Sequence, residues 1–299
     1  MTETIPVAVP RKGRPLEAVL QRVAAEADAQ EVADAIISTL RYEKAVTKGD
    51  QTPDRGAYDR LADYSHLGEP TRPDYTLLRD DRAGKPRRIV FDSVTVPVGD
   101  ANLRLVGREE PFRALRKHEF ALGFDSADLV LEEVVELRPD PLTRIADVNA
   151  RIDPHDTDVR VVSGMGDTVY HTLMATPETL PQGEQPTREF LTDYEGSLCI
   201  SPRYERLVEA VLGTRNADSL RFEYPGEHEE EEAAIADAGV GVYLTVTGST
   251  AREHGLVVGE ELFPSETVLM ENCSEASAGV ERAKEVFVRA ETESEMAIY

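Results

Sequence analysis

Apolar and polar residues alternate along the chain with two periods, one typical of strands and one of helices. Residues 5–9 form an almost continuous apolar run that indicates a buried strand, and residues 16–23 then carry apolar side chains at helical spacing. Pro15 suits the first turn of that helix. Repeated exchange of strand and helix along a chain predicts an α/β protein whose helices cover its sheets.

The clearest strand–helix series lies between residues 197 and 246. Extended apolar runs are separated there by two helical patterns, which predicts a βαβαβ arrangement with parallel strands. The predicted strands are 197–200, 220–224 and 240–246, and the predicted helices are 204–212 and 229–236. Elsewhere the pattern predicts strands at 89–98, 103–106, 120–124, 159–162, 169–174 and 267–270, and helices at 32–40, 111–118, 127–133, 188–194 and 278–290.

Between residues 42 and 88 the periodic pattern is lost, because Gly, Pro and Asp cluster there several times. We interpret this segment as a polar insertion with little core of its own. The predicted organisation is therefore a first lobe of residues 1–130 that contains the insertion, a central second lobe of residues 131–250, and a C-terminal return to lobe one over residues 251–299.

Length and composition narrow the class of protein. A chain of 299 residues can bury a sizeable core, and 40% hydrophobic with 30% charged residues is ordinary for a globular protein. No apolar run reaches the roughly 18 residues that a membrane-spanning helix needs, and residues 1–10 do not resemble a signal peptide. Cys199 and Cys273 are too few and too isolated for a disulfide framework or a zinc site. We expect a cytoplasmic protein without a membrane partner.

The net charge of −24 needs its own explanation. Asp and Glu number 57 against 33 Lys and Arg, the acids are spread over the whole chain, and only six of the bases are lysines. Carboxylates hold water and repel one another, and molar salt shortens the screening length to about 3 Å. The pattern favours adaptation to a salt-rich cytoplasm over the alternative, an acidic partner of basic proteins. We expect no nucleic-acid ligand, because binding the duplex backbone needs a basic face.

Salt dependence tests this interpretation. Because screening relieves the repulsion among dispersed carboxylates, we expect the thermal midpoint to rise steeply as potassium chloride goes from dilute to molar concentration. A midpoint that stays flat or falls over that range, followed by circular dichroism, would contradict it.

A glycine turn follows the last strand of the βαβαβ series. Its four residues are Thr247, Gly248, Ser249 and Thr250. Glycine permits a tight backbone, and the amide and hydroxyl groups can surround a phosphate. The alternative is an ordinary strand-to-helix turn in which a threonine caps the helix. We predict phosphate binding by this glycine turn.

A basic loop lies at the end of the first predicted strand. Its residues are Arg11, Lys12, Gly13 and Arg14, after Pro10. Ligands of open α/β sheets gather at the carboxyl ends of strands, and a polyphosphate is the natural counter-charge of such a cluster. A solvated basic turn is the alternative. The six histidines of the chain have no metal-binding spacing, so we expect them to be structural and predict no metal site made by the protein.

These segments resemble the ATP phosphoribosyltransferase family, the first enzymes of histidine biosynthesis. The basic loop with Pro10 and Leu16 is similar to the family's Pro-x-Lys-Gly-Arg-Leu, and residues 121–128, which end in Asp128, are similar to its Asp-Leu-Gly-Ile-Thr-Gly-x-Asp. Residues 200–204 are similar to its Thr-x-Tyr-Pro segment. The glycine turn resembles the end of its signature, with Gly226, Glu229 and Asp237 at earlier signature positions. From the sequence, Asp128 by itself is a capping acid of a helix.

The resemblance implies a two-lobed α/β fold like a type II periplasmic binding protein, with mixed sheets and a cleft between the lobes. It implies transfer of ribose 5-phosphate from phosphoribosyl pyrophosphate to N1 of ATP or to a related base, with Mg²⁺ on the leaving pyrophosphate. The glycine turn would bind the 5-phosphate, Glu229 and Asp237 would act as catalytic acids near the ribose, and the basic loop would bind pyrophosphate or nucleotide. A homo-oligomer is left open.

Several departures from the family pattern keep a second hypothesis open. The family's second acid before the turn falls on Tyr243, and Ser126 stands where the family has Gly. Two residues are added between Asp237 and Gly248, and the regulatory C-terminal domain of long members is absent from residues 1–299. A divergent, non-catalytic ligand-binding or regulatory paralogue is therefore the alternative to an active transferase.

Overall fold

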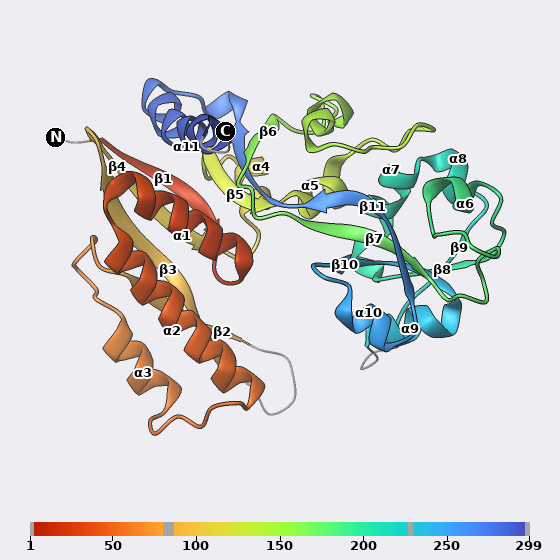
Figure 1. Cartoon of the computed structure of the whole chain (residues 1–299). Helices are drawn as coiled ribbons and strands as arrows, with labels where there is room; N and C mark the ends of the chain where they lie inside the picture. The colour runs from red at the N-terminus through yellow and green to blue at the C-terminus, as the bar shows by residue number, and fades with distance from the viewer. Residues whose placement is uncertain (1–2, 80–86, 227–229, 297–299) are drawn as a thin grey trace. The chain divides into compact units, whose positions relative to one another are not determined.

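The computed structural model describes residues 3–79, 87–226 and 230–296 (Figure 1). The chain divides into two compact units. Unit 1 consists of residues 1–125, 158–167 and 267–299, and unit 2 consists of residues 126–157 and 168–266. Each unit has its own mixed sheet with helices, so the predicted α/β class with two mixed sheets is confirmed.

Unit 1 is built on a seven-stranded sheet in the order β2-β3-β4-β1-β5-β12-β6. Its strands are β1 (Glu3–Pro10), β2 (Asp74–Arg79), β3 (Arg87–Val98), β4 (Ala101–Arg108), β5 (Leu122–Ser126), β6 (Val159–Gly164) and β12 (Thr267–Asn272). The central strand β1 runs parallel to β4 and β5, whereas β2–β3, β3–β4 and β12–β6 are antiparallel pairs. Parallel pairing brings the carboxyl ends of β1 and β4 together, where Pro10 pairs with Arg108.

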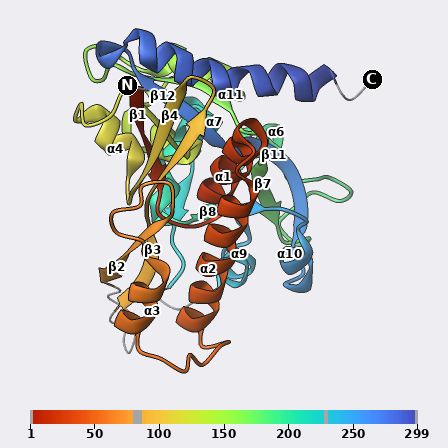
Figure 2. The same ribbon diagram turned by 90° about the vertical axis from the view of Figure 1, so that its left-hand side faces the viewer.

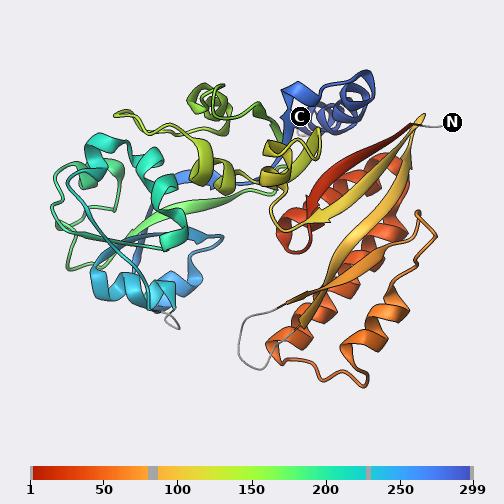
Figure 3. The same ribbon diagram turned by 180° about the vertical axis from the view of Figure 1, so that it is seen from behind.

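The helices of unit 1 are α1 (Arg14–Ala27), α2 (Gln30–Lys48), α3 (Ala57–Tyr64), α4 (Pro111–Arg116) and α11 (Ala278–Met296), with a short 3-10 helix at Cys273–Glu275. Helices α1 and α2 pack side by side on one face of the sheet, and Figure 3 shows β1, β3 and β4 in front of them. The apolar stripe of α1 enters a core with Phe91, Leu105 and Phe124. Helix α11 lies beside β1 and α1 (Figure 2), with Phe287 against Phe124.

The segment predicted as a polar insertion contains regular structure, which corrects the prediction for residues 42–88. Helix α2 continues to Lys48, α3 follows, and β2 pairs with β3. Tyr75 of β2 is buried with the core of unit 1. The apolar pattern of α2 stops before the helix does, because Glu43, a charged residue, occupies a buried position of the helix.

Unit 2 contains a five-stranded sheet in the order β11-β7-β10-β8-β9. Its strands are β7 (Val169–Ala175), β8 (Ser197–Ile200), β9 (Arg221–Glu223), β10 (Val240–Thr245) and β11 (Val257–Ser265). Its helices are α5 (Ala127–Val134), α6 (Arg188–Thr192), α7 (Glu205–Leu212), α8 (Thr214–Ala217), α9 (Glu231–Ala238) and α10 (Ser249–Glu253), with 3-10 helices at Ile145–Arg151 and Pro202–Tyr204. Strands β10, β8 and β9 are parallel, which confirms the predicted βαβαβ series, while β7 is antiparallel to β10 and β11.

The two units exchange segments at places other than the predicted boundaries at 130 and 250. Residues 158–167 belong to unit 1 because β6 pairs with β12. Residues 251–266 belong to unit 2 because β11 pairs with β7, so the chain returns to unit 1 at Thr267. Among the described residues, no helix has the length and apolarity that crossing a membrane requires.

Candidate functional site

The basic loop, Arg11–Arg14, leaves the carboxyl end of β1 and leads directly into α1. Gly13 has a φ of 87°, in the left-handed region that favours glycine, and its carbonyl accepts the first hydrogen bond of the helix from Glu17. This turn lets the chain reverse tightly over the end of the sheet. The loop therefore stands where ligands of open α/β sheets gather.

The two arginines of the loop have different surroundings. Arg11 turns back along the sheet, where its Nη1 lies 3.3 Å from Oδ1 of Asp92. A Cβ on Gly107 would lie 3.1 Å from Cγ of Arg11 and 2.5 Å from the carbonyl oxygen of Phe91, so only glycine leaves room for this path. Arg14 donates through Nη1 to Oδ2 of Asp167 at 3.0 Å.

A pocket of about 630 Å³ opens beside the loop in unit 1. Its polar lining consists of five cationic side chains and one carboxylate, which are Lys12, Arg14, Arg41, Lys44, Arg88 and Glu17. Gly13, Leu40, Ile89 and Val90 complete it. We call it the cationic pocket. Of the four loop residues predicted to bind polyphosphate, the structure brings Lys12, Gly13 and Arg14 to this pocket, and Arg11 does not line it.

The glycine turn, Thr247–Thr250, connects β10 to α10 in unit 2. Gly248 has a φ of 66°, and the hydroxyls of Thr247 and Ser249 are 3.1 Å apart. The side chains of Thr247, Ser249 and Thr250 are exposed, as a phosphate site needs. Arg252, which the sequence did not single out, donates from Nη1 to the Thr247 carbonyl at 2.8 Å and places a cation at the turn.

Packing and backbone conformation already require a glycine at position 248, whether or not a ligand binds there. A Cβ at this position would lie 2.9 Å from Cγ2 of Val258, and its left-handed backbone already disfavours other residues. A substitution of Gly248 would therefore disturb packing and ligand binding together. Thr250, whose side chain is exposed, is the cleaner position for a test.

The acids predicted for catalysis are not gathered at the glycine turn. Asp237 is exposed near the end of α9, just before β10 begins, whereas the turn follows the end of β10. The six residues of β10 span about 20 Å, so Asp237 lies at the opposite end of the strand. Glu229 lies outside the described residues.

The start of α9 carries the carboxylates that do lie near the turn. Oε2 of Glu230 is 3.4 Å from Nε2 of His254, which directly follows α10. The phenol of Tyr243 on β10 donates a hydrogen bond to the carboxylate of Glu231. Burial, followed by the charges of Glu231 and Glu232, raises the pKa of Tyr243. Tyr243, which stands at the position of the family's second acid, is thus hydrogen-bonded to a carboxylate.

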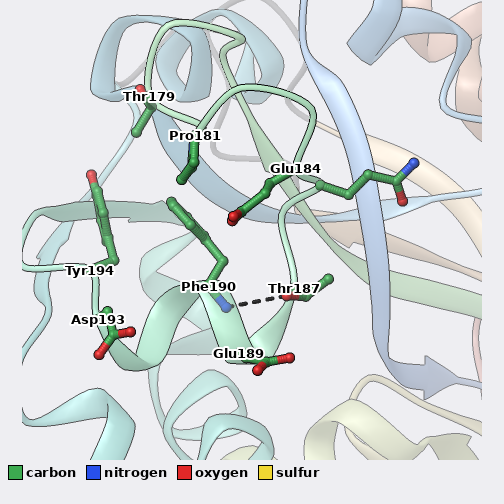
Figure 4. A pocket seen from close by; sticks show the side chains of 9 residues that line it. Thr179, Pro181, Glu184, Thr187, Glu189, Phe190, Asp193 and Tyr194 are labelled. Atoms are coloured by element: carbon green, nitrogen blue, oxygen red, sulfur yellow. Dashed lines mark hydrogen bonds between the residues drawn. The ribbon is translucent and has the colours of Figure 1, made fainter.

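A second large pocket, of about 620 Å³, lies in unit 2 around α6 and contains none of the predicted residues. Figure 4 shows the ring of Phe190 in its centre, flanked by Tyr194 and Glu184. Glu189 and Asp193 add two more carboxylates to the lining. This lining disfavours phosphorylated ligands, which would meet like charge.

Sequence reasoning missed the contribution of α2 and β3 to the cationic pocket, namely Arg41, Lys44 and Arg88. Lysine usage carried a usable signal, because the chain has only six lysines and two of them, Lys12 and Lys44, line this pocket. The packing of α1 against α2 could not be predicted from the sequence, and it brings together residues that are some 30 positions apart.

A cationic pocket on one α/β unit and a hydroxyl-rich glycine turn on the other are typical of proteins that handle phosphorylated small molecules. The sequence matches one protein family, described as halobacterial ATP phosphoribosyltransferase, over residues 1–298. The chain therefore belongs to the halobacterial ATP phosphoribosyltransferase family, which confirms the resemblance seen in its motifs. Among curated proteins, none matches the sequence.

Solved structures show distant likenesses. The chain is similar to an ATP phosphoribosyl transferase (HisG:HisZ) complex from Thermotoga maritima at 14% identity and a TM-score of 0.42, covering 95% of this chain and 99% of that one. A mutant of ArgBP from T. maritima matches at 10% identity and a TM-score of 0.35, covering 66% and 75%. The regulatory domain of OxyR2 from Vibrio vulnificus matches at 15% identity and a TM-score of 0.32, covering 63% and 81%.

Proposed function

We propose that this protein transfers ribose 5-phosphate from phosphoribosyl pyrophosphate to ATP or a related base. The observation that carries the proposal is the cationic pocket at the basic loop, in a chain whose family is that of ATP phosphoribosyltransferases. In a chain of net charge −24, a pocket with five cations and one carboxylate is a strong local exception. Multiply charged anions fit such a lining.

The reaction breaks the bond between ribose C1 and pyrophosphate and forms a bond from C1 to the base nitrogen, through an oxocarbenium-like transition state. Lys12 and Arg14 stabilise the charge that develops on the departing pyrophosphate. The glycine turn with Arg252 holds the 5-phosphate and so positions the ribose. Because Asp237 lies at the far end of β10, the carboxylate near the ribose is supplied from the start of α9, where Glu231 meets Tyr243.

The family resemblance implies Mg²⁺, and the described residues offer no donor set for this ion. The described parts of the chain contain no group of three or more His, Cys, Asp or Glu side chains that could hold a metal ion. The cationic pocket offers one carboxylate, Glu17, among five cations, which does not fit a metal ion held by protein ligands. No step of the proposed reaction is therefore assigned to a metal held by the protein.

The glycine turn is tested by Thr250→Ala. Loss of one charge-assisted donor should weaken ribose 5-phosphate binding by about 1.5–3 kcal/mol, or less in molar salt, while the fold is kept. Ser219→Ala removes another exposed hydroxyl of unit 2 and serves as the control. Thermal shift in molar potassium chloride compares ribose 5-phosphate, phosphoribosyl pyrophosphate and ribose. If no phosphorylated ligand shifts the wild type at millimolar concentration, the turn is structural and the proposal fails.

The second candidate function is ligand binding without chemistry. It is favoured by Tyr243, which stands where the family has an acid and whose phenol is joined to Glu231. Pyrophosphate release from phosphoribosyl pyrophosphate in the presence of ATP separates the two candidates. Binding of both substrates without release of pyrophosphate would establish the non-catalytic role.

A further inference from the structure

The pocket around α6, called the α6 pocket below, lies at the edge of the unit 2 sheet opposite the glycine turn. All its lining residues belong to the segment 179–194, which connects β7 to β8. The phenol of Tyr194 donates a hydrogen bond to the carbonyl of Ser197, the first residue of β8, at 3.1 Å. Strands β8 and β10 are parallel, and the glycine turn follows the carboxyl end of β10. The α6 pocket, at the amino end of β8, is therefore separate from the proposed phosphate site.

The walls of the α6 pocket are fixed by the surrounding fold. The amide of Glu260 on β11 donates to the carbonyl of Pro186 at 2.9 Å. A Cβ on Gly259 would collide with that same carbonyl, so the glycine allows the wall to lie close against β11. Thr187 caps α6 by accepting a hydrogen bond from the amide of Phe190 at 3.2 Å. Because these walls are already ordered, a ligand loses little free energy in ordering them.

Two aromatic rings give the α6 pocket an apolar surface. The ring centroids of Phe190 and Tyr194 are 5.3 Å apart, and both residues are half-buried. A Cβ on Gly196 would collide with the ring of Tyr194, so the glycine makes room for this ring. Figure 4 shows Phe190 between Tyr194 and the carboxylate of Glu184. The faces of such rings attract cations as well as apolar groups.

The charge of the lining is negative. Its carboxylates are Glu184, Glu189 and Asp193, and none of the described residues that line the pocket is Lys, Arg or His. Arg188, the nearest base in sequence, pairs with Glu260 on β11. Acidic residues occur all along this chain, and molar salt screens charges beyond about 3 Å, so carboxylates alone would hold a cation weakly. The two rings distinguish this place from other acidic surfaces of the protein.

We propose that the α6 pocket binds a small organic cation with an apolar body, such as an alkylated ammonium or a guanidinium compound. The two rings contact the apolar body and the cationic group, and the three carboxylates select the sign of the charge. The volume of about 620 Å³ lies within the usual range of small-molecule sites, about 300–1,000 Å³. The inference adds a second ligand site to unit 2 and does not depend on the proposed transferase activity.

Three probes with one benzyl or phenyl ring and different charges test the site by calorimetric titration at a fixed molar concentration of potassium chloride. Benzyltrimethylammonium should bind more tightly than benzyl alcohol, and benzoate should bind least. Phe190→Leu keeps an apolar side chain but removes a ring face, so it should weaken binding of the cation at least about fivefold and binding of the alcohol less.

A pair of charge variants completes the test. Glu184→Gln should weaken binding of benzyltrimethylammonium, because one carboxylate of the lining is lost. Glu178→Gln removes an exposed carboxylate of the same connection that does not line the pocket, and should leave the affinity unchanged. Both side chains are exposed, so this comparison holds even if Phe190→Leu does not fold.

Equal affinity of the wild type for the three probes would overturn the inference, and so would a lack of benzyltrimethylammonium binding at millimolar concentration. Equal affinities of Glu184→Gln and Glu178→Gln for this cation would do the same. None of these titrations involves a phosphorylated ligand. Failure of the transferase proposal would therefore leave the α6 pocket standing, and failure here would leave the transferase proposal unchanged.

Discussion

Arg60→Ala should lower the free energy of unfolding by about 3–5 kcal/mol, because it strands a buried carboxylate. Glu43 of α2 is 3% exposed, and both its oxygens are held by Arg60 of α3, through Nε and Nη2 at 2.8 Å each. The hydroxyl of Tyr64 donates to the same carboxylate at 3.2 Å. A buried charge without its partner costs far more free energy than the ion pair contributes. Loss of Arg60 should therefore lower the free energy of unfolding more than its few contacts suggest.

Arg55→Ala is the matched control for this prediction. Arg55 lies five positions before Arg60 and pairs with Asp63 of α3, but both partners are about half exposed, at 54% and 50%. Its loss should change the unfolding free energy by about 0–1 kcal/mol. Urea unfolding at constant potassium chloride measures both variants. Equal, small losses would show that water reaches Glu43 in the native protein. The double variant Glu43→Met with Arg60→Met should recover most of the stability.

The same buried carboxylate explains why sequence reasoning failed between residues 42 and 88. A helical pattern is recognised by apolar residues at helical spacing, and α2 places Glu43 where the pattern calls for an apolar side chain. The compensating Arg60 lies 17 positions away, on a different helix. An ion pair between two helices cannot be recognised from the sequence of either helix alone. The sequence therefore indicated a polar insertion where the structure has two helices and a strand.

Strand β11 was missed for a different reason. Its pairing with β7 is interrupted twice by register shifts, around Glu261, and Gly259 and Pro264 lie within it. Bulges break the alternation of apolar and polar residues on which strand prediction depends. By contrast, β8, β9 and β10 were predicted within one or two residues. The buried strand β8 and the first half of β10 are continuous apolar runs, as expected of buried parallel strands, whereas β9 is short and largely exposed and was placed by the helical patterns on either side of it.

Motif resemblance gave the family but did not place every residue of the site. The basic loop and the glycine turn each sit at the end of a strand, and both positions follow from the order of elements. Asp237 was aligned by its neighbours in sequence, yet α9 continues past it and carries it to the far end of β10. The stretch from Asp237 to Gly248 is two residues longer than in the family, so a residue there can match the family motif in sequence and still occupy a different position in the structure.

Asp128 shows how a residue that looked like a helix cap gains a second role through packing. It lies in the first turn of α5, but it is only 5% exposed. Oδ1 of Asp128 is 3.1 Å from Nε2 of His171 on β7, and Oδ2 accepts a hydrogen bond from Ser265 at the end of β11 at 2.9 Å. One carboxylate thus joins a helix and two strands within unit 2.

Asp128→Asn should therefore destabilise the protein at neutral pH and lose that effect in acid. Burial opposes ionisation of this carboxyl, but the hydrogen bonds and charge of His171 and the hydrogen bond of Ser265 outweigh it, so the pKa of Asp128 is lowered below its ordinary 3.8. A lowered pKa contributes stability that is present above the ordinary value and is lost as pH falls through the folded-state value. The wild type should exceed Asp128→Asn by about 1.5–3 kcal/mol near neutral pH.

The measurement is urea unfolding of both proteins from neutral pH down to below pH 3.8, the ordinary value for this carboxyl, at constant molar potassium chloride. The difference between wild type and Asp128→Asn should be constant above that value and shrink below it, because protonation then removes the carboxylate from the wild type as well. Asp147→Asn is the control. Hydrogen bonding by Arg144 also lowers the pKa of Asp147, but the pair is exposed and its loss should change little. A difference for Asp128→Asn that does not change with pH would mean that the variant disturbs packing, and that the charge on Asp128 does not stabilise unit 2.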